Sequence, residues 1–148
     1  MAHLKILPNV LRNYEVLEHT ADIGIRVKAS SLEGLFKNAG LAIADISTEK
    51  SKIINPEKHK IVVTQKADNL EELFVNWLNE LLSVSAAEGL IFKDIKINQV
   101  NEQLVDAVIT GEHISNYKTN IEIKAATYHR LKVGKTGSLW QAEVIFDV

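Results

Sequence analysis

The sequence contains no cysteine among its 148 residues. This absence excludes disulfide bonds, thiolate zinc sites, iron–sulfur ligation and a cysteine nucleophile. Redox chemistry would therefore need a bound cofactor. The chain also lacks an apolar run of about 18 residues, the length of a membrane-spanning helix, and residues 1–8 lack the apolar core of a signal peptide. We therefore expect a cytoplasmic protein.

The chain has little net charge, with 17 Lys and Arg residues against 19 Asp and Glu residues, a balance of −2. It lacks the basic excess typical of an autonomous nucleic-acid-binding protein, so RNA would be contacted only indirectly. The length and the 46% content of hydrophobic residues favour one compact domain. We expect an N-terminal extension at residues 1–13, which include Pro8, and a single domain at residues 14–148.

Strict alternation of apolar and polar residues predicts strands at residues 23–29 and 140–147. The same alternation places Asp22 and Asp147 on the polar faces of their strands. Further strands are predicted at residues 60–65, 92–100, 104–111 and 119–127.

Apolar residues spaced by three and four predict two amphipathic helices, one from Leu32 to Ile46 and one from Leu70 to Leu82. Ser30 with Glu33 is the expected capping box of the first helix, while Asp68 or Asn69 opens the second and Gly89 ends it. Because the strands gather late in the chain, we expect an α+β fold. In this fold a mostly antiparallel sheet carries both helices on one face, as a two-layer sandwich.

The segment Val133-Gly134-Lys135-Thr136 resembles the end of a phosphate-binding P-loop. However, His129 stands where the first glycine of that motif belongs, and a strand rather than a helix is predicted afterwards. The pattern therefore favours a hairpin turn at residues 134–137. No two histidines have the helical i, i+4 spacing of a zinc protease, and no Gly-x-Ser-x-Gly motif is present. We predict no catalytic residues.

Two segments at predicted strand ends are unusually polar, residues 18–22 and residues 124–129. Turn chemistry and a solvated sheet edge would explain them without any function. A functional site would also explain them, because each segment combines ionisable groups with hydrogen-bond donors and acceptors.

Four segments occur in order along the chain: Glu18-His19-Thr20-Ala21-Asp22-Ile23-Gly24-Ile25, Ser31-Leu32-Glu33-Gly34-Leu35-Phe36, Glu122-Ile123-Lys124-Ala125-Ala126-Thr127-Tyr128-His129 and Val144-Ile145-Phe146-Asp147-Val148. With these segments, residues 14–148 resemble the archease family, small accessory proteins of the RtcB-type tRNA-splicing RNA ligase. The chain departs from the family pattern at Glu18, where aspartate is common. It departs again at residues 116–119, which lack a histidine that family members often carry there.

The resemblance implies a site for a divalent cation, usually taken to be calcium, formed by Asp22, Asp147 and the terminal residue Val148. Calcium prefers six to eight oxygen ligands, and carboxylates supply them. Magnesium and manganese accept the same ligands, so the choice of cation stays open. By the same resemblance, His19, Lys124 and His129 are the residues expected to contact the partner.

The resemblance further implies that the chain is a non-catalytic activator of the RNA ligase. It would promote guanylylation of the ligase histidine by GTP and so permit repeated turnover. Two alternatives remain open. One is a chaperone or scaffold for RNA- or DNA-processing proteins, and the other is a stand-alone metal-dependent enzyme acting on phosphoesters.

Overall fold

The computed structural model describes residues 3–5, 13–18, 22–49, 53 and 55–148. The helices of this part of the chain are α1 (Leu32–Ser47) and α2 (Leu70–Glu88), with a short 3₁₀ helix η1 (Ile114–Asn116). The strands are β1 (His3–Lys5), β2 (Tyr14–Glu18), β3 (Ile23–Ala29), β4 (Thr48–Glu49), β5 (Lys58–Lys66), β6 (Leu90–Val100), β7 (Leu104–His113), β8 (Lys118–Thr119), β9 (Ala125–Ala126), β10 (Lys132–Thr136) and β11 (Leu139–Asp147).

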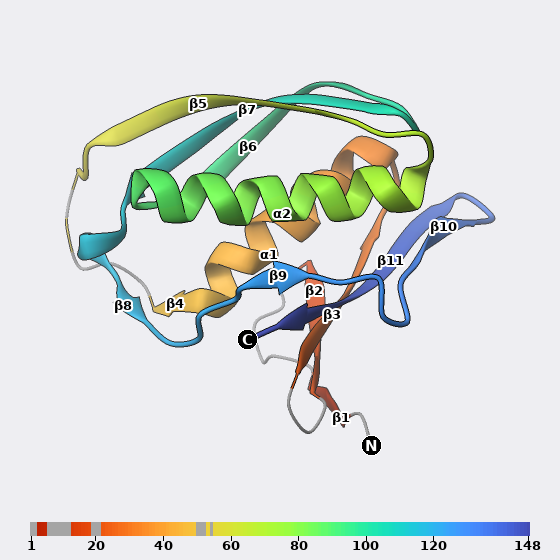
Figure 1. The fold of residues 1–148 in the computed structure, drawn as a ribbon, viewed down its shortest axis with the longest axis horizontal. Helices are drawn as coiled ribbons and strands as arrows, with labels where there is room; N and C mark the ends of the chain where they lie inside the picture. Colours follow the sequence, from red (N-terminus) through yellow and green to blue (C-terminus); the bar gives the residue numbers. More distant parts are fainter. Residues whose placement is uncertain (1–2, 6–12, 19–21, 50–52, 54) are drawn as a thin grey trace.

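The strands form antiparallel sheets, and the α+β class expected from the sequence is confirmed (Figure 1). One sheet has the order β1-β2-β3-β11-β10, with β9 also paired to β11, and a second has the order β5-β7-β6. Strands β4 and β8 form a separate pair. Strand β1 falls within the expected N-terminal extension and pairs with β2 at the sheet edge.

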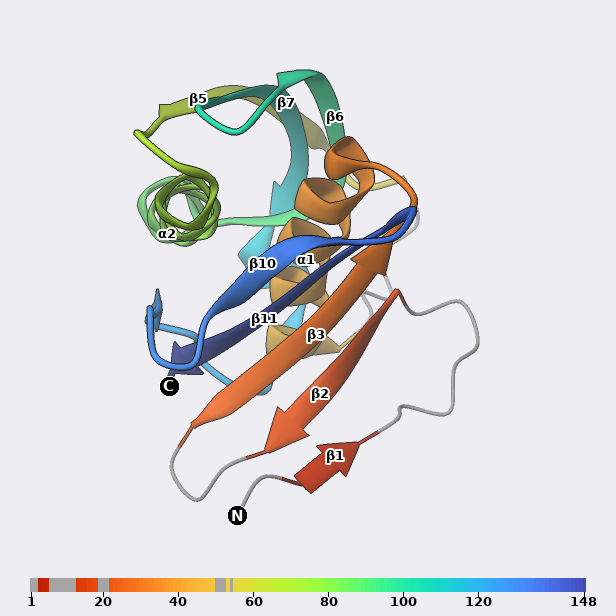
Figure 2. The same ribbon diagram turned by 90° about the vertical axis from the view of Figure 1, so that its right-hand side faces the viewer.

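Both helices lie between the two larger sheets (Figure 2). This adds one layer to the expected two-layer arrangement, because the strands divide between two sheets and each sheet covers the helices from its own side. The burial pattern explains the division. Leu73, Phe74 and Val75 are consecutive in α2 and all buried, so the apolar surface of this helix is too wide for a single sheet to cover.

The helix termini follow local capping chemistry. The Ser31 hydroxyl accepts the Gly34 N–H at 3.0 Å, so the expected cap at Ser30 is wrong by one residue. Asn69 caps α2 by accepting the Glu72 N–H at 2.9 Å. Gly89 ends α2 as predicted, in the left-handed conformation that glycine adopts without a steric penalty (φ 65°).

Two strand predictions need correction in the last third of the chain. The expected strand at 119–127 divides into β8 and β9, because the Asn120 N–H donates to Ser47 O at the end of α1 while the Lys124 N–H donates to Asp147 O. The segment between them thus bridges two elements instead of pairing with one. The hairpin of β10 and β11 is confirmed, but Thr136 pairs with Leu139, so its turn lies at residues 137–138.

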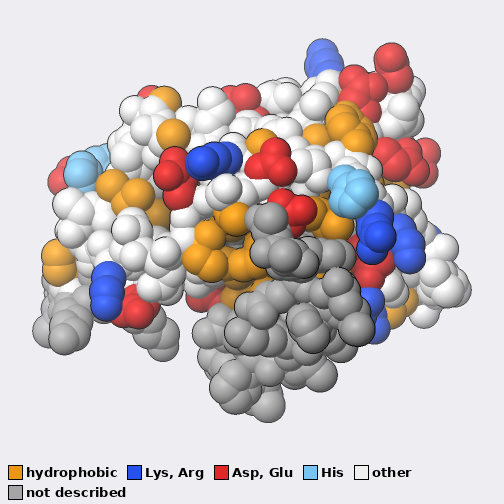
Figure 3. All heavy atoms as spheres, turned by 60° about the horizontal axis from the view of Figure 1, so that its bottom comes forward, with side chains coloured by type: hydrophobic (Ala, Val, Ile, Leu, Met, Phe, Trp, Pro, Cys, Tyr) orange, Lys and Arg blue, Asp and Glu red, His pale blue; other side chains and the backbone are white. Residues whose placement is uncertain are grey.

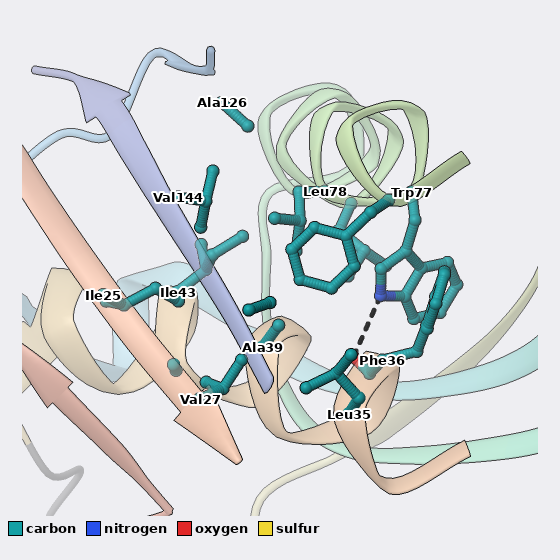
Figure 4. Close-up of a cluster of buried hydrophobic side chains, with 14 of the residues drawn as sticks. Ile25, Val27, Leu35, Phe36, Ala39, Ile43, Trp77, Leu78, Ala126 and Val144 are labelled. Atoms are coloured by element: carbon teal, nitrogen blue, oxygen red, sulfur yellow. Dashed lines mark hydrogen bonds between the residues drawn. The ribbon is translucent and has the colours of Figure 1, made fainter. Parts of the chain in front are cut away.

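Aromatic side chains join the two helices at the centre of the core (Figure 4). The buried Trp77 of α2 donates its indole Nε1–H to the Phe36 carbonyl of α1 at 3.0 Å. The Phe36 and Phe74 rings pack edge to face, with their centroids 5.3 Å apart. Gly40 permits the close approach of α1, because a Cβ there would lie 2.6 Å from Ile95 Cδ1 of β6.

The face of the first sheet that points away from the helices carries a row of alternating charges. Arg26 lies opposite Glu15 on β2 and opposite Glu143 on β11. Its Nη2 is 2.6 Å from Glu143 Oε1 and its Nη1 is 3.1 Å from Glu15 Oε2. Lys132 of β10 approaches the other Glu143 oxygen at 3.5 Å. The row therefore ties four strands together across the sheet.

This row predicts a loss of stability in acid that depends on Glu143. Burial opposes ionisation of its carboxyl, but hydrogen bonds and charges from Arg26 and Lys132 outweigh burial and lower the pKa. The stabilisation is therefore complete above the unfolded glutamate pKa of about 4.3 and disappears as the pH falls through the lower folded value. We expect Glu143→Gln to lower the free energy of unfolding by about 1 kcal/mol at pH 7. The free energy of unfolding, measured with urea, should then fall less steeply below about pH 5 than it does for wild type. Glu102→Gln, in an exposed turn, is the control; an equally steep fall for Glu143→Gln and wild type would contradict the assignment.

Candidate metal and partner-binding site

The candidate site lies at one end of the first sheet, where β2, β3, β11 and β9 meet. Ile23 of β3 pairs with Phe146 of β11, and extending this antiparallel register by one residue places Asp22 opposite Asp147. On its other side, Asp147 pairs with Ala125 of β9. The register thus brings together two aspartates that are more than a hundred residues apart in the sequence.

Both aspartates lie on the same face of the sheet. Residues directly opposite in an antiparallel pair project to the same side, and Asp22 and Asp147 share the parity of Arg26 and Glu143. The predicted polar-face positions are therefore consistent with the register. Asp22 is half-buried and Asp147 is exposed, so the pair is accessible to solvent.

Lys124 lies beside this pair. Its backbone N–H donates to Asp147 O at 2.8 Å, and its side chain is exposed. Continuing the register of β9 with β11 places Lys124 opposite Val148, the last residue of the sequence, which is 43% exposed. The structure therefore brings four of the six predicted site residues to one strand end.

The donor chemistry of this strand end fits a hard divalent cation. The described residues contain no group of three His, Asp or Glu side chains close enough to hold a metal ion. Two aspartates supply only part of the six to eight oxygens that calcium prefers, so main-chain or carboxylate oxygens and water would complete the set. Val148 follows Asp147 directly and is suitably placed to supply one.

The two predicted partner-binding histidines have different outcomes. His19 lies outside the described residues. His129 is exposed in a turn opposite Val144, three residues along β11 from Asp147, or roughly 10 Å at the usual rise of a strand. It shares the sheet edge with Lys124 but is set apart from the aspartates.

Asn79 on α2 is a positioning residue that the sequence patterns did not indicate. Its Oδ1 accepts the Ala126 N–H at 2.7 Å, and its Nδ2 donates to Ala126 O at 3.2 Å. The amide thus pairs with both backbone groups of β9, as a neighbouring strand would. Because β9 fixes the far side of Asp147, Asn79 helps to set the position of the site. A polar residue flanked by buried Leu78 on an apolar helix is the only signal in the sequence.

We expect Asn79→Ala to lower the free energy of unfolding by about 1–3 kcal/mol, because it leaves buried backbone groups of Ala126 unpaired. Amide hydrogen exchange at Ala126 should accelerate more than exchange at Ile109, in the centre of β7. Asn76→Ala, on the same helix, is the matched control for loss of an amide side chain. Unchanged exchange at Ala126 would show that the two hydrogen bonds do not hold β9.

Tyr117 lies in the segment that lacks the family histidine. Its hydroxyl donates to the carboxylate of Glu112. Glu112 is 7% exposed and is the buried charged residue in the part of the chain that the structure describes. Burial and this hydrogen bond raise the pKa of Tyr117 well above its ordinary value, so the phenol stays protonated. Lys93 Nζ lies 5.2 Å from the ring centroid. These contacts are with β6 and β7, and they link Tyr117 to the fold rather than to the aspartate pair.

Among the residues that the structure describes, no helix combines the length and the apolar character needed to cross a membrane.

Comparison with known proteins identifies similar chains. The model of the Archease protein family (MTH1598/TM1083) matches residues 14–148. The protein archease of Methanosarcina acetivorans is 31% identical over 148 residues, covering 96% of this chain and 100% of that protein. The protein archease of Pyrococcus abyssi is 33% identical over 144 residues, covering 93% of this chain and 100% of that protein.

Two solved structures share the fold. The solution structure of Methanobacterium thermoautotrophicum protein 1598 superposes with a TM-score of 0.71 at 29% identity, covering 93% of this chain and 100% of that one. A crystal structure from Thermotoga maritima, described as an archease and possible chaperone, gives a TM-score of 0.64 at 22% identity, covering 99% and 100%. At that identity the second likeness shows the fold alone.

Proposed function

The chain belongs to the archease protein family, and from this premise we propose that it is an accessory activator of an RtcB-type tRNA-splicing RNA ligase. The observation that supports this proposal is the placement of Asp22 opposite Asp147, with Lys124 alongside, at a solvent-accessible strand end. Such an arrangement offers an exposed polar surface to a partner.

The proposed action is to promote guanylylation of the ligase histidine and so to permit repeated turnover. Positioning and charge neutralisation account for most of the catalysis of phosphoryl-type transfer. An accessory protein can therefore raise the rate without contributing a nucleophile. In this role Lys124, His129 and His19 would contact the ligase. Asp22 and Asp147 would hold a cation whose positive charge lies next to the ligase.

We propose that Asp22, Asp147 and the terminal carboxylate of Val148 hold a divalent cation; the family resemblance favours calcium, and magnesium and manganese accept the same oxygen ligands. When bound, the cation would supply positive charge next to the ligase nucleotide site. The chain's own part is to fix three anionic ligands at one strand end. Two observations support this proposal: the register of β3 with β11, extended by one residue, sets Asp22 opposite Asp147, and the Lys124 N–H donates to Asp147 O at the end of β11.

The test is RNA ligation with limiting ligase from the same organism, GTP and a divalent metal, counting joined products per ligase. A rise from a single turnover to repeated turnover on adding this chain is the expected result. Equal product counts with and without the chain, when the ligase is shown to be active, would overturn the proposal.

Two other functions give different results in simple assays. A general chaperone, the description given for the Thermotoga maritima structure, would suppress aggregation of unrelated client proteins, and Asp147→Ala would not change that effect. A stand-alone metal-dependent enzyme would hydrolyse a phosphoester without ligase in the presence of calcium, magnesium or manganese. We expect neither result.

A further inference from the structure

A four-residue turn interrupts the edge of the first sheet between β9 and β10. Thr127 hydrogen-bonds to Ile145 O, and Lys132 pairs with Glu143, so residues 128–131 face only Val144 of β11. Four residues against one cannot stay in the plane of the sheet. The turn therefore projects from the edge, as bulges do where a sheet presents side chains for a purpose.

Arg130 occupies a position in this turn that favours glycine. The Leu131 N–H donates to Tyr128 O at 3.2 Å, which makes Arg130 the third residue of a β-turn. Its φ is +53°, as in type II turns, whose third residue is usually glycine. A non-glycine residue has a steric cost in this conformation. Arginine at this position therefore has a steric cost in the folded state, and residues in such conformations are frequent at functional sites.

The base of the turn is held firmly. The Thr127 N–H and hydroxyl both donate to Ile145 O, at 3.0 and 2.8 Å. The same hydroxyl oxygen accepts the His129 N–H at 3.3 Å. Tyr128, on this base, is 58% exposed and is the one aromatic residue among the exposed large hydrophobic side chains of the described residues. A preorganised turn loses little entropy when it binds a partner.

The stretch of sequence that contains the turn is basic, and Glu122 and Glu143 flank it directly. Residues 123–142 contain four of the 17 Lys and Arg residues and none of the 19 Asp and Glu residues. The rest of the chain therefore carries an acid excess of six. On the face shown in Figure 3, Lys and Arg side chains lie beside a histidine, with Asp or Glu side chains among them. Lys124, His129, Arg130, Lys132 and Lys135 are all exposed, and Lys132 Nζ lies 3.5 Å from the Glu143 carboxylate.

We propose that the turn at residues 128–131 is an anchor for the partner protein, with Tyr128 filling an apolar recess and Arg130 pairing with carboxylates at its rim. This rests on the proposed function for the identity of the partner, the RNA ligase. Tyrosine and arginine are enriched among the residues that contribute most to protein–protein binding. A single-stranded RNA site would instead need several stacking aromatics along a basic groove. The acid excess of the remaining chain would also repel an extended polyanion.

The experiment measures the dissociation constant of the ligase for wild-type chain, Tyr128→Ala and Arg130→Gly at low and high salt. We expect Tyr128→Ala to weaken binding about 10-fold or more at both salt concentrations. Arg130→Gly should weaken it several-fold, mainly at low salt, while the melting temperature stays equal or rises because glycine relieves the turn. Val62→Ala, 68% exposed on β5, and Lys60→Gln are matched controls that should bind as wild type.

Wild-type affinity in both Tyr128→Ala and Arg130→Gly would overturn the anchor and leave the activator function in place. If wild-type chain does not bind the ligase at all, the activator function fails and the anchor is decided separately. In that case NMR titrations compare an acidic peptide containing one phenylalanine with an oligouridylate. Shifts confined to residues 127–132 with the peptide support the anchor; shifts with RNA alone, or with neither probe, overturn it.

Discussion

Replacing Trp77 with alanine is expected to lower the free energy of unfolding by about 3–5 kcal/mol. The indole is fully buried, contacts the Phe36 ring and donates its Nε1–H to the Phe36 carbonyl at 3.0 Å. The substitution would leave a large cavity between α1 and α2 at the point where Gly40 lets α1 approach Leu81 and Ile95. The two helices cannot close this cavity easily, because a sheet lies on either side of them.

Urea unfolding followed by circular dichroism measures the loss. Trp77→Phe keeps most of the apolar volume but removes the donor, so it should cost about 1–2 kcal/mol. Trp140→Ala is the matched control, because that indole is only half-buried on β11, and it should cost less than Trp77→Ala. Equal losses for the two alanine variants would show that the helix interface does not depend on the buried indole.

Local pattern was sufficient for the elements whose hydrogen bonds close within a few residues. The helix α2 shows this clearly, since its cap at Asn69 and its end at Gly89 depend only on side chains and backbone angles nearby. Strand β3 was also predicted with its observed bounds, because Ile23, Ile25 and Val27 alternate with polar or small residues. Its hydrogen bonds are made to β2 and β11, however, and the alternation alone did not indicate these partners.

Features that depend on distant partners could not be predicted in the same way. The pattern of residues 119–127 is compatible with one strand, but the donors of Asn120 and Lys124 pair with α1 and with β11. Similarly, alternation indicated that Asp22 and Asp147 lie on polar faces, while only the register of β3 with β11 places them opposite each other. The two hydrogen bonds between the Asn79 amide and Ala126 have no sequence motif, because the partner groups belong to the backbone.

The aspartate pair leads to the largest functional prediction. Asp22→Ala and Asp147→Ala should each reduce joined products per ligase to the level seen without this chain. Each variant removes one of the three anionic ligands proposed for the cation, and a divalent ion held by oxygen ligands loses most of its affinity when a carboxylate is lost. Isothermal titration with calcium provides a readout that does not depend on the ligase, and both variants should lose the binding heat of wild type.

Removing one of these carboxylates should not lower the thermal stability of the chain when no metal is present, although it abolishes activation. Like charges directly opposite each other destabilise a strand pair by roughly 0.2–1 kcal/mol. Asp147→Asn keeps the size and the acceptor oxygen of the side chain but removes one of the two charges. We therefore expect it to melt at an equal or higher temperature than wild type in chelator. Added calcium should then raise the melting temperature of wild type only, because a ligand stabilises the state that binds it.

Combining the substitutions distinguishes one shared site from two independent effects. If Asp22 and Asp147 hold the same ion, the double variant should activate the ligase no less than either single variant, because the first substitution already removes the ion. Adding two glycines after Val148 should act like a third substitution, since it moves the terminal carboxylate away from the strand end. Asp94→Ala, an aspartate 64% exposed on β6, is the control and should activate as wild type does. Independent, multiplying losses from Asp22→Ala and Asp147→Ala would mean that each aspartate contacts the ligase separately, and the shared cation site would then be wrong.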